Sequence, residues 1–465
     1  MPSCLLIAGT HSGVGKTTVA LALMAAFTAR GRTVQPFKVG PDFIDPGHHR
    51  AACGRDSRNL DGWMLSSQHN QHIFFRASLD ADLSIIEGVM GLFDGSAATG
   101  QQGSTAEQAK LLKAPVILVI DGQALARSAA ALVHGYATFD PDLTIAGVVC
   151  NRVKSPGHFQ LLKEAIETEA KVPVVGYVRP HDRFAIPERH LGLHMALEGR
   201  SPDFYTALGE WISDTLDLAK LEKIASSCAS FPLTENERTD KGGQSPVPHR
   251  VRVGVAYDRA FCFYYPDNFE ALATEGAEIV TFSPLTDQAL PEVDLVYIGG
   301  GYPELYAETL AANTRMREAI RAFAACGGIV YAECGGLMYL TQGIRDHNGQ
   351  THEMVGLFPA EVVISQDKLT LGYRQVEIVQ SCAIGEAGLV GRGHEFHVST
   401  LEAKGPLAFS CRLWDAQGRE VGYDGLMAHN VIALYTHLHF ASQPAIPRAL
   451  VQRAHAVRSA VIERV

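Results

Sequence analysis

The chain has 465 residues, of which 46% are hydrophobic and 19% charged, a composition typical of a globular protein with two or three domains. Its formal net charge is −10 and it has no long lysine or arginine run, which argues against a nucleic-acid partner. No apolar stretch reaches the roughly eighteen residues of a membrane span, and residues 1–3 form no charged leader, so we expect a cytoplasmic protein without membrane partners.

A glycine-rich loop lies between the first predicted strand, Cys4–Ala8, and a predicted helix over Val19–Ala29. Residues 9–18 read Gly-Thr-His-Ser-Gly-Val-Gly-Lys-Thr-Thr. The backbone N–H groups of such a loop bind phosphate oxygens, Lys16 reaches the β- and γ-phosphates, and the Thr17 hydroxyl binds Mg²⁺. We therefore expect a nucleoside triphosphate to be bound by Gly13, Val14, Gly15, Lys16, Thr17 and Thr18.

The loop departs from the common phosphate-binding pattern in one place. Thr10 stands where the first glycine is usual, and Gly9 lies one position earlier. A dinucleotide-binding fingerprint fits less well, because it needs a further glycine where the chain has Thr18. A purely structural turn is the remaining alternative, and the flanking strand and helix favour the phosphate loop over it.

Short apolar segments alternate with helical segments through the first half of the chain. Each is apolar on both faces, as are the strands of a parallel sheet covered by helices. Glu87, Asp121 and Asn151 each end such a segment, and ligands of open α/β sheets bind beyond these carboxyl ends. The predicted strands are Cys4–Ala8, Thr33–Val39, Leu83–Glu87, Val116–Asp121, Ile145–Asn151 and Val174–Val178.

The organisation changes in the middle of the chain. Residues 225–250 are polar, rich in turn-forming residues and without a hydrophobic period, which predicts a linker. We therefore expect one domain over residues 1–224 and a second α/β domain over residues 251–465. The predicted strands of the second domain are Val251–Ala256, Glu278–Phe282, Leu295–Gly299 and Gly328–Ala332.

Cys334 lies between a predicted strand and a predicted helix. A sharp turn at such a place exposes a nucleophile and requires small neighbours, which Ala332, Gly335 and Gly336 provide. We expect the helix N-terminus to lower the pKa of the thiol. The N–H groups of Gly335 and of Gly301, which belongs to a glycine run after another strand, are candidates for an oxyanion hole. The remaining cysteines form no Cys-x-x-Cys pair and are expected to be reduced thiols.

The general base for this cysteine is expected to be a distant histidine. His437 and His439 occupy alternate positions of an extended segment, so both can face one way, and we expect His437 to be the base. A zinc site among these two histidines and His394, His397 and His429 is a weaker interpretation, because no cysteine pair accompanies them.

Two long motifs and the order of the two halves carry a family resemblance. Residues 37–46 read Phe-Lys-Val-Gly-Pro-Asp-Phe-Ile-Asp-Pro, and residues 87–95 read Glu-Gly-Val-Met-Gly-Leu-Phe-Asp-Gly. Together with Gly372–Arg374, Gly393–His397 and His437–His439, they resemble the cobyrinic acid a,c-diamide synthases, which are glutamine-dependent amidotransferases of corrin biosynthesis. The resemblance covers nearly the whole chain outside the linker. It implies an α/β fold with a dethiobiotin-synthetase-like P-loop domain and a mostly parallel sheet, followed by a flavodoxin-like class I glutamine amidotransferase domain.

The resemblance also implies a reaction: the ATP- and glutamine-dependent amidation of the a and c carboxylates of cobyrinic acid through acyl phosphates. ATP and Mg²⁺ would be the cofactors, and L-glutamine and a corrinoid or related tetrapyrrole polycarboxylate the partners, with a homodimer left open. Related enzymes act on hydrogenobyrinic acid or nickel sirohydrochlorin, and the sequence does not separate these substrates. Two other classes of function stay open at this stage: a P-loop regulatory ATPase with a non-catalytic amidotransferase-like module, and a ligase that uses free ammonia.

Four residues in or near the phosphate loop and the strand ends receive roles by resemblance to dethiobiotin synthetase. Thr17, Asp42 and Glu87 would hold Mg²⁺, which prefers oxygen ligands. Lys38 would neutralise the phosphate that is transferred. The alternative for the acids is capping and turn formation, and their clustering beside a phosphate loop favours a functional role for Asp42 and Glu87.

Other candidates rest on weaker signals. Asp45 and Asp94 would lie near the reacting carboxylate or its nucleophile, although both also occur in turn-forming contexts. Asn151 would contact the adenine base, with capping as an equal alternative. His48 and His49 follow a Pro-Gly pair and are expected in a solvated turn, with a corrin contact as the minor alternative.

The sequence departs from class I amidotransferases in two places. Ala332 stands where a glycine is usual two residues before the cysteine, and it is still small. His439 stands where a glutamate usually completes a triad with the histidine, so the residue that orients His437 is open. The displaced glycine before Thr10 is not a departure from the family, because dethiobiotin synthetase shares it. Tyr373, Arg374 and His394 are expected to border the substrate or a domain surface.

Overall fold

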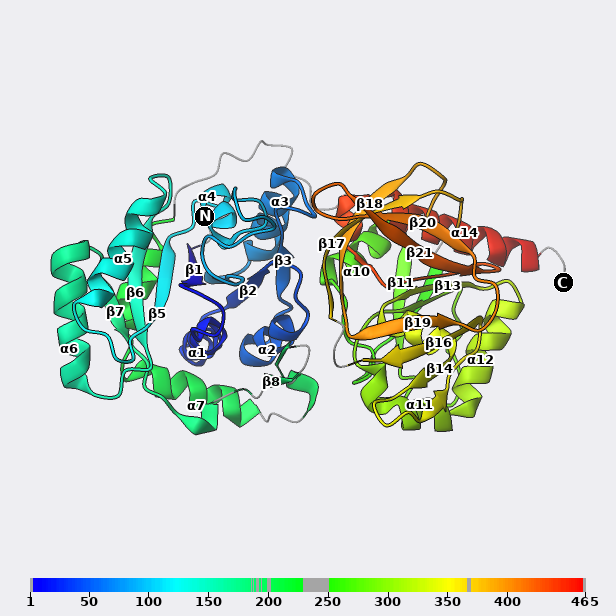
Figure 1. Ribbon diagram of the computed structural model, residues 1–465, viewed down its shortest axis with the longest axis horizontal. Helices are drawn as coiled ribbons and strands as arrows, with labels where there is room; N and C mark the ends of the chain where they lie inside the picture. Colours follow the sequence, from blue (N-terminus) through cyan, green and yellow to red (C-terminus); the bar gives the residue numbers. More distant parts are fainter. Residues whose placement is uncertain are drawn as a thin grey trace. The chain divides into compact units, whose positions relative to one another are not determined.

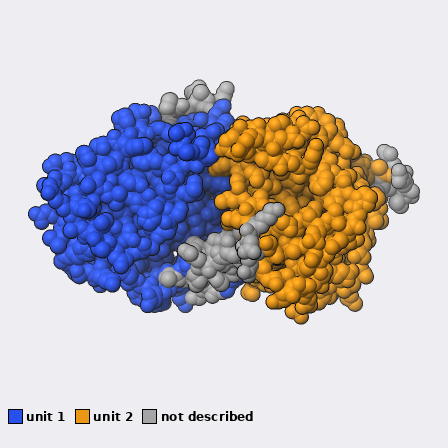
Figure 2. Space-filling view, in the orientation of Figure 1, with its two compact units in different colours: residues 1–239 blue, residues 240–465 orange. Residues whose placement is uncertain are grey.

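A computed structural model describes residues 3–184, 186, 188–189, 192–193, 195–198, 202–228, 251–365 and 369–462. The chain divides into two compact units, residues 1–239 and 240–465 (Figure 2). The predicted linker, residues 225–250, lies outside the described residues from residue 229 onward. Within the described part of the chain, no helix is both long and apolar enough to cross a membrane.

Unit 1 is built on a seven-stranded parallel sheet in the order β3-β2-β4-β1-β5-β6-β7 (Figure 1). This confirms the predicted parallel sheet, and the predicted strand ends agree with the observed ones to within one residue. Strand β3 was not predicted, because three residues are too few to show a pattern. The strands are β1 (Ser3–Gly9), β2 (Val34–Val39), β3 (Arg58–Leu60), β4 (Leu83–Glu87), β5 (Val116–Asp121), β6 (Ile145–Asn151) and β7 (Val174–Tyr177).

Helix α1 (Lys16–Ala29) is the central helix of unit 1. Its sequence is apolar on nearly every side, as expected of a helix that is buried all round. It lies between the sheet and α7 (Pro202–Ser213) and contacts both (Figure 1). The other helices of this unit include α2 (Ile44–Cys53), α3 (Ser67–Ser78), α4 (Thr105–Leu111), α5 (Ser128–Phe139), α6 (Pro156–Ala165) and α8 (Leu218–Ala225).

The register of the sheet brings the carboxyl ends of three adjacent strands to one edge. Glu87, the last residue of β4, is paired with Ile7 of β1 and with Lys38 of β2. The loop after β1 and the start of α2 after β2 therefore leave the sheet beside Glu87. This is the edge at which ligands of open α/β sheets bind.

Unit 2 combines a ten-stranded mixed sheet, in the order β11-β10-β12-β13-β22-β21-β20-β17-β18-β23, with a four-stranded sheet in the order β15-β14-β16-β19. In the larger sheet the pairs from β11 to β22 are parallel and those from β22 to β23 are antiparallel. The strands of the larger sheet are β10 (Val251–Ala256), β11 (Ala277–Phe282), β12 (Leu295–Ile298), β13 (Ile329–Glu333), β17 (Thr370–Ile378), β18 (Val390–His397), β20 (Phe409–Trp414), β21 (Glu420–Ala428), β22 (Val431–Leu434) and β23 (His437–Leu438).

The second domain was predicted less completely than the first. The four predicted strands correspond to β10–β13 and agree with them to within one residue. The antiparallel strands were not predicted, because many of their residues are half-buried: in β16, buried and partly exposed residues alternate. The remaining elements are β14 (Thr341–Arg345), β15 (Thr351–Glu353), β16 (Phe358–Ile364), β19 (Ser399–Ala403), α10 (Pro266–Thr274), α11 (Ala307–Ala312), α12 (Thr314–Ala325), α13 (Gly335–Leu340) and α14 (Ala445–Ile462).

The packing of α7 on α1 depends on a glycine. A Cβ atom on Gly209 would lie 2.7 Å from the backbone nitrogen of Ala26 and 2.9 Å from the carbonyl carbon of Ala25. We expect Gly209→Ala to destabilise unit 1 by about 1–3 kcal/mol, because rigid backbone must move. The matched control is Gly135→Ala in α5, where a Cβ meets nothing within 4 Å and the higher helix propensity of alanine should stabilise by about 0.5–1 kcal/mol. Calorimetric unfolding of the two variants checks this, and equal shifts in melting temperature would contradict it.

Candidate active sites

The phosphate loop of unit 1 starts at the end of β1 and leads into α1. Gly15, directly before α1, has a φ of 99°, a left-handed conformation that favours glycine. A Cβ on Gly15 would lie 2.1 Å from the amide nitrogen of Asn151, which donates a hydrogen bond of 2.7 Å to the carbonyl of Val14. Arg152 donates to the carbonyl of Gly13 at 2.7 Å. The end of β6 therefore supports the loop directly.

This support differs from the roles considered for Asn151 in the sequence. Its side chain binds the loop backbone, and its proposed adenine contact stays a prediction. Arg152 was not singled out at all. It also pairs with Asp121, the last residue of β5, at 2.6 Å. The signal that could have found it is its place directly after a strand end at the ligand-binding edge.

Lys16, the lysine of the loop, is largely buried and donates to the carbonyl of His11 at 3.2 Å. Burial lowers its pKa, and the positive charge of Lys38 lowers it further. The ammonium groups of Lys16 and Lys38 thus lie at the same edge of the sheet. Two positive charges there suit the binding of a polyanion such as a triphosphate.

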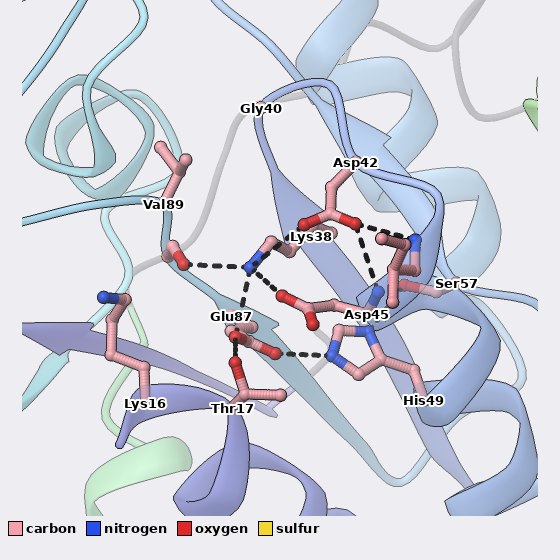
Figure 3. Close-up of polar contacts among 12 residues, drawn as sticks. Lys16, Thr17, Lys38, Gly40, Asp42, Asp45, His49, Ser57, Glu87 and Val89 are labelled. Carbon is pink, nitrogen blue, oxygen red and sulfur yellow. Dashed lines mark hydrogen bonds and ion pairs between the residues drawn. The ribbon is translucent and has the colours of Figure 1, made fainter. Parts of the chain in front are cut away.

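Lys38 lies at the centre of a buried polar cluster (Figure 3). Its ammonium nitrogen is 2.6 Å from an oxygen of Asp45, 3.1 Å from one of Glu87 and 3.9 Å from one of Asp42. Burial opposes the charged form, but the surrounding carboxylates outweigh it and raise the pKa of Lys38. The structure therefore brings together four of the residues predicted for this site.

Glu87 connects this cluster to the phosphate loop. One carboxylate oxygen accepts a hydrogen bond of 2.6 Å from the Thr17 hydroxyl, and the other lies 2.7 Å from Nε2 of His49 (Figure 3). Although burial would raise the pKa of Glu87, the neighbouring Lys38 and the contact with His49 hold it below its usual range. Glu87 is thus an anion within contact of the first turn of α1.

The prediction of a solvated turn at His48 and His49 is wrong. Both side chains are fully buried in α2. The helix forms because Asp42 accepts the N–H groups of Ile44 and Asp45 at 2.8 and 3.1 Å, which caps its first turn. The available signal was the spacing of Asp45 and His49, which are four residues apart and so share one helix face.

The two histidines have different partners. Nδ1 of His49 lies 2.9 Å from the hydroxyl of Ser57, so His49 bridges Ser57 and Glu87. Nδ1 of His48 instead lies 2.7 Å from the hydroxyl of Tyr205 in α7. His49 therefore belongs to the charged cluster and His48 to the packing of α2 on α7.

The structure does not bring Asp94 into this cluster. Its side chain is exposed and accepts the N–H of Gly91 at 2.9 Å, so it closes the turn after β4. Its negative charge nevertheless acts on Lys16, whose pKa it raises slightly against the effect of burial. The turn-forming alternative is thus observed for Asp94, and its predicted role near the substrate is untested.

The metal-binding prediction can be compared with the donor set. Within the described residues, no three His, Cys, Asp or Glu side chains are grouped as a metal site. Thr17 and Glu87 nevertheless place two oxygen donors 2.6 Å apart, next to the phosphate loop. Mg²⁺ commonly binds one or two carboxylates and takes its other ligands from phosphates and water. Thr17 and Glu87 supply donors of this kind, and Asp42, whose carboxylate lies 3.9 Å from the Lys38 ammonium, stays the predicted second carboxylate.

In unit 2, Cys334 occupies the predicted turn between β13 and α13. Its φ of 45° is strained for a residue other than glycine. A Cβ on Gly336 would lie 2.1 Å from the carbonyl oxygen of Ile298, so the turn tolerates no side chain there. A Cβ on Gly335 would lie 3.1 Å from the backbone nitrogen of Gly301. The two predicted oxyanion-hole residues therefore belong to loops that are in contact.

His437 lies at the same loop. Its imidazole packs so closely on Gly300 that a Cβ there would be 2.3 Å from Cε1 of the ring. The ring stacks on His394 with a centroid distance of 5.0 Å. Burial lowers the pKa of His437, and the neighbouring His394 and His397 lower it further. His437 is therefore neutral, the state that a general base requires.

One prediction for unit 2 is wrong. The pKa of the Cys334 thiol is raised rather than lowered, because burial and the nearby acids, Glu304 first, outweigh the short helix that follows. His394 is buried, with its Nδ1 3.0 Å from the hydroxyl of Tyr265, and the expectation that it borders the substrate stays a prediction. His439 is fully buried and packs on the ring of Tyr265 at 4.6 Å between centroids.

The contacts of His49 lead to a test of its role. We expect His49→Ala to destabilise unit 1 by about 1–3 kcal/mol, because Glu87 loses a buried hydrogen bond, and to weaken nucleotide binding about tenfold. His48→Ala is the matched control: it removes a buried histidine of the same helix that contacts Tyr205 instead of Glu87. Calorimetric unfolding and titration with a non-hydrolysable ATP analogue measure both effects. Equal nucleotide affinity in the two variants would contradict the role.

Comparison with known proteins agrees with the two-part organisation. The CobQ/CobB/MinD/ParA nucleotide binding domain matches residues 5–193, and the CobB/CobQ-like glutamine amidotransferase domain matches residues 252–445. Cobyrinate a,c-diamide synthase of Priestia megaterium is 43% identical over 98% of this chain and 97% of its own length. The enzyme of the same name from Salmonella typhimurium is 43% identical over 94% of this chain and 95% of its own length. The enzyme of that name from Picrophilus torridus is 42% identical over 97% of this chain and 99% of its own length.

Proposed function

Because this chain belongs to the cobyrinate a,c-diamide synthase family, we propose that its two candidate sites perform successive parts of one reaction. The chain is a glutamine-hydrolysing carbon–nitrogen ligase of cobalamin biosynthesis, which amidates the a and c carboxylates of cobyrinate at the expense of ATP. We assign the ATP-dependent step to residues 1–224 and the release of ammonia from glutamine to residues 251–465. The observation that carries this division is Cys334 in a left-handed turn, with His437 against the adjoining glycine loop.

In the glutaminase step, the Cys334 sulfur attacks the side-chain carbonyl carbon of glutamine. His437 takes the thiol proton as the bond forms and gives it to the departing ammonia. Because both groups are neutral in the free protein, transfer of the proton and attack occur together. The N–H groups of Gly301 and Gly335 stabilise the oxyanion. Water then hydrolyses the thioester, which releases glutamate and restores the thiol.

In the synthetase step, a carboxylate of cobyrinate attacks the γ-phosphorus of ATP to give an acyl phosphate and ADP. Ammonia then displaces phosphate from the acyl carbon to give the amide. The loop N–H groups, Lys16 and Lys38 neutralise the charge of the transferred phosphoryl group. Mg²⁺, held through Thr17, Glu87 and Asp42, would supply further neutralisation of the phosphates. Asp45 keeps the Lys38 ammonium in place through its 2.6 Å contact.

The role of Cys334 is tested by replacing its sulfur. We expect Cys334→Ser to lower glutamine-dependent amidation at least about 10³-fold, because a serine hydroxyl is a weaker nucleophile there. Amidation with added ammonium salt should stay within about twofold of the unchanged protein, because the synthetase residues are intact. Cys326→Ser, an exposed cysteine in the same unit, is the control and should change neither rate. Undiminished glutamine use by Cys334→Ser would refute the assignment.

The role of Lys16 is tested by a variant that should lose the synthetase step and keep the glutaminase step. Lys16→Ala should abolish amidation from both glutamine and ammonia, because the acyl phosphate cannot form without charge neutralisation at the phosphates. Glutaminase activity, measured as glutamate release, should persist. Lys154→Ala removes an exposed lysine of the same unit and serves as the control. With the unchanged protein, product mass after incubation with cobyrinate, hydrogenobyrinate or nickel sirohydrochlorin identifies the substrate. Retention of ammonia-dependent amidation would contradict the proposed role.

A further inference from the structure

Glu333 is a buried acid for which the reaction as described has no use. It is the last residue of β13, directly before Cys334, and its side chain is almost completely inaccessible. One carboxylate oxygen accepts the backbone N–H of Leu438 at 2.9 Å and the hydroxyl of Tyr331 at 2.5 Å. The other accepts the hydroxyl of Tyr297 at 2.9 Å. All of these contacts lie inside unit 2.

The contact with Leu438 matters because of the neighbours of that residue. Leu438 follows His437 in the chain, so a hydrogen bond to its N–H fixes the peptide that joins the two residues. The imidazole of His437 packs tightly on Gly300. A small shift of this peptide would therefore move the ring relative to the glycine loop.

Three buried side chains hold the backbone of residues 435–440. Asp424 accepts two N–H groups just before His437, at 2.9 and 3.0 Å. Asn268 binds a carbonyl and an N–H just after it, both at 2.8 Å. Glu333 accepts the N–H directly after His437 at 2.9 Å. Of these three, Glu333 is the one adjacent in sequence to the nucleophile.

The strand pairing reinforces this link. Glu333 is paired with Leu434 of β22, and the N–H of Cys334 donates to the carbonyl of Leu434 at 2.7 Å. The end of β13 is thus tied to the chain before His437 by backbone bonds and to the chain after it by the Glu333 side chain. Burial raises the pKa of Glu333 to about 7, and either protonation state keeps an oxygen that can accept from Leu438.

We propose that Glu333 is a positioning residue that fixes the His437 imidazole relative to the Cys334 sulfur, by joining the strand of the nucleophile to the backbone of the base. It acts on the peptide after the histidine and not on the ring itself. The inference rests on the proposed roles of Cys334 and His437. It supplies a carboxylate for the histidine segment of a chain that has His439 where a class I enzyme usually has a glutamate.

The test compares two substitutions at this position. Glu333→Ala leaves the N–H of Leu438 without this acceptor, and we expect the glutaminase kcat to fall about 100-fold, as for a catalytic group misplaced by about 1 Å. KM for glutamine should stay within about threefold, because Glu333 is not placed against the substrate. Glu333→Gln keeps an acceptor oxygen and should retain kcat to within about tenfold. Ammonia-dependent amidation should be unchanged in both variants.

Tyr297→Phe is the matched control. It removes a hydroxyl that contacts the other oxygen of Glu333 and the side chain of Asn268, and it leaves the backbone bonds that Glu333 and Asn268 make in place, so kcat should change less than about threefold. If calorimetry shows that Glu333→Ala does not fold, Glu333→Asp replaces it. The shorter side chain withdraws the acceptor, and kcat should fall at least about tenfold with KM unchanged.

Three results would overturn the inference: an unchanged kcat in Glu333→Ala or its Asp replacement, an equal loss in Glu333→Gln and Glu333→Ala, or a rise in KM without a loss of kcat. Each of these leaves the roles of Cys334 and His437 intact. Those roles fail only if Cys334→Ser or His437→Ala keeps its glutaminase activity, so the two kinds of failure are distinguishable.

Discussion

The Lys38 ammonium is buried, and a buried charge persists only when opposite charges surround it. Removing one partner of such a pair typically costs about 3–5 kcal/mol. The position of Lys38 therefore requires the carboxyl groups of Asp45 and Glu87 beside it. Because Glu87 also binds Thr17, the same requirement fixes the first turn of α1 relative to the ends of β2 and β4. The phosphate loop and the acidic strand ends are thus one electrostatic unit.

Unit 2 meets a different requirement, since burial disfavours charge on the two groups proposed to react there. Burial disfavours the charged forms of both Cys334 and His437, so neither is stabilised as an ion in the free protein. The proposed glutaminase step then depends on the distance and orientation between the thiol and the imidazole, because a stable thiolate is not present beforehand. This explains why rigid features surround the pair: a strained turn, glycines without room for a side chain, and buried side chains bound to the histidine backbone. Charged side chains therefore dominate the candidate site of unit 1, whereas rigid packing dominates the candidate site of unit 2.

The parts of the structure that follow from local pattern were predictable from the sequence. Most of the parallel strands are predominantly apolar segments, and the residues at their ends, such as Glu87, follow from the general rule for α/β sheets. The turn at Cys334 was predictable because a strand, a cysteine and two glycines occur in order.

The parts that depend on distant contacts were not predictable. The Pro-Gly pair before His48 and His49 is typical of a turn, and the contact of His49 with Glu87, 38 positions away, forms only in the folded chain. The direction of the Cys334 pKa shift depends on burial by the whole unit, which no short motif contains. Glu333 is linked to Leu438 across 105 positions, and only the folded sheet brings them together. The antiparallel strands were missed because half-buried segments lack a continuous apolar pattern.

The central claim is that a thiol in unit 2 releases the nitrogen that an ATP-activated carboxylate in unit 1 captures. Amidation of cobyrinate with glutamine labelled with ¹⁵N in its side-chain amide, in the presence of ATP and without added ammonium, tests it most directly. The account predicts a diamide in which both new amide nitrogens carry the label, as read by mass spectrometry. A product with unlabelled amides, or labelled ammonia released without any gain of amide on the macrocycle, would contradict it.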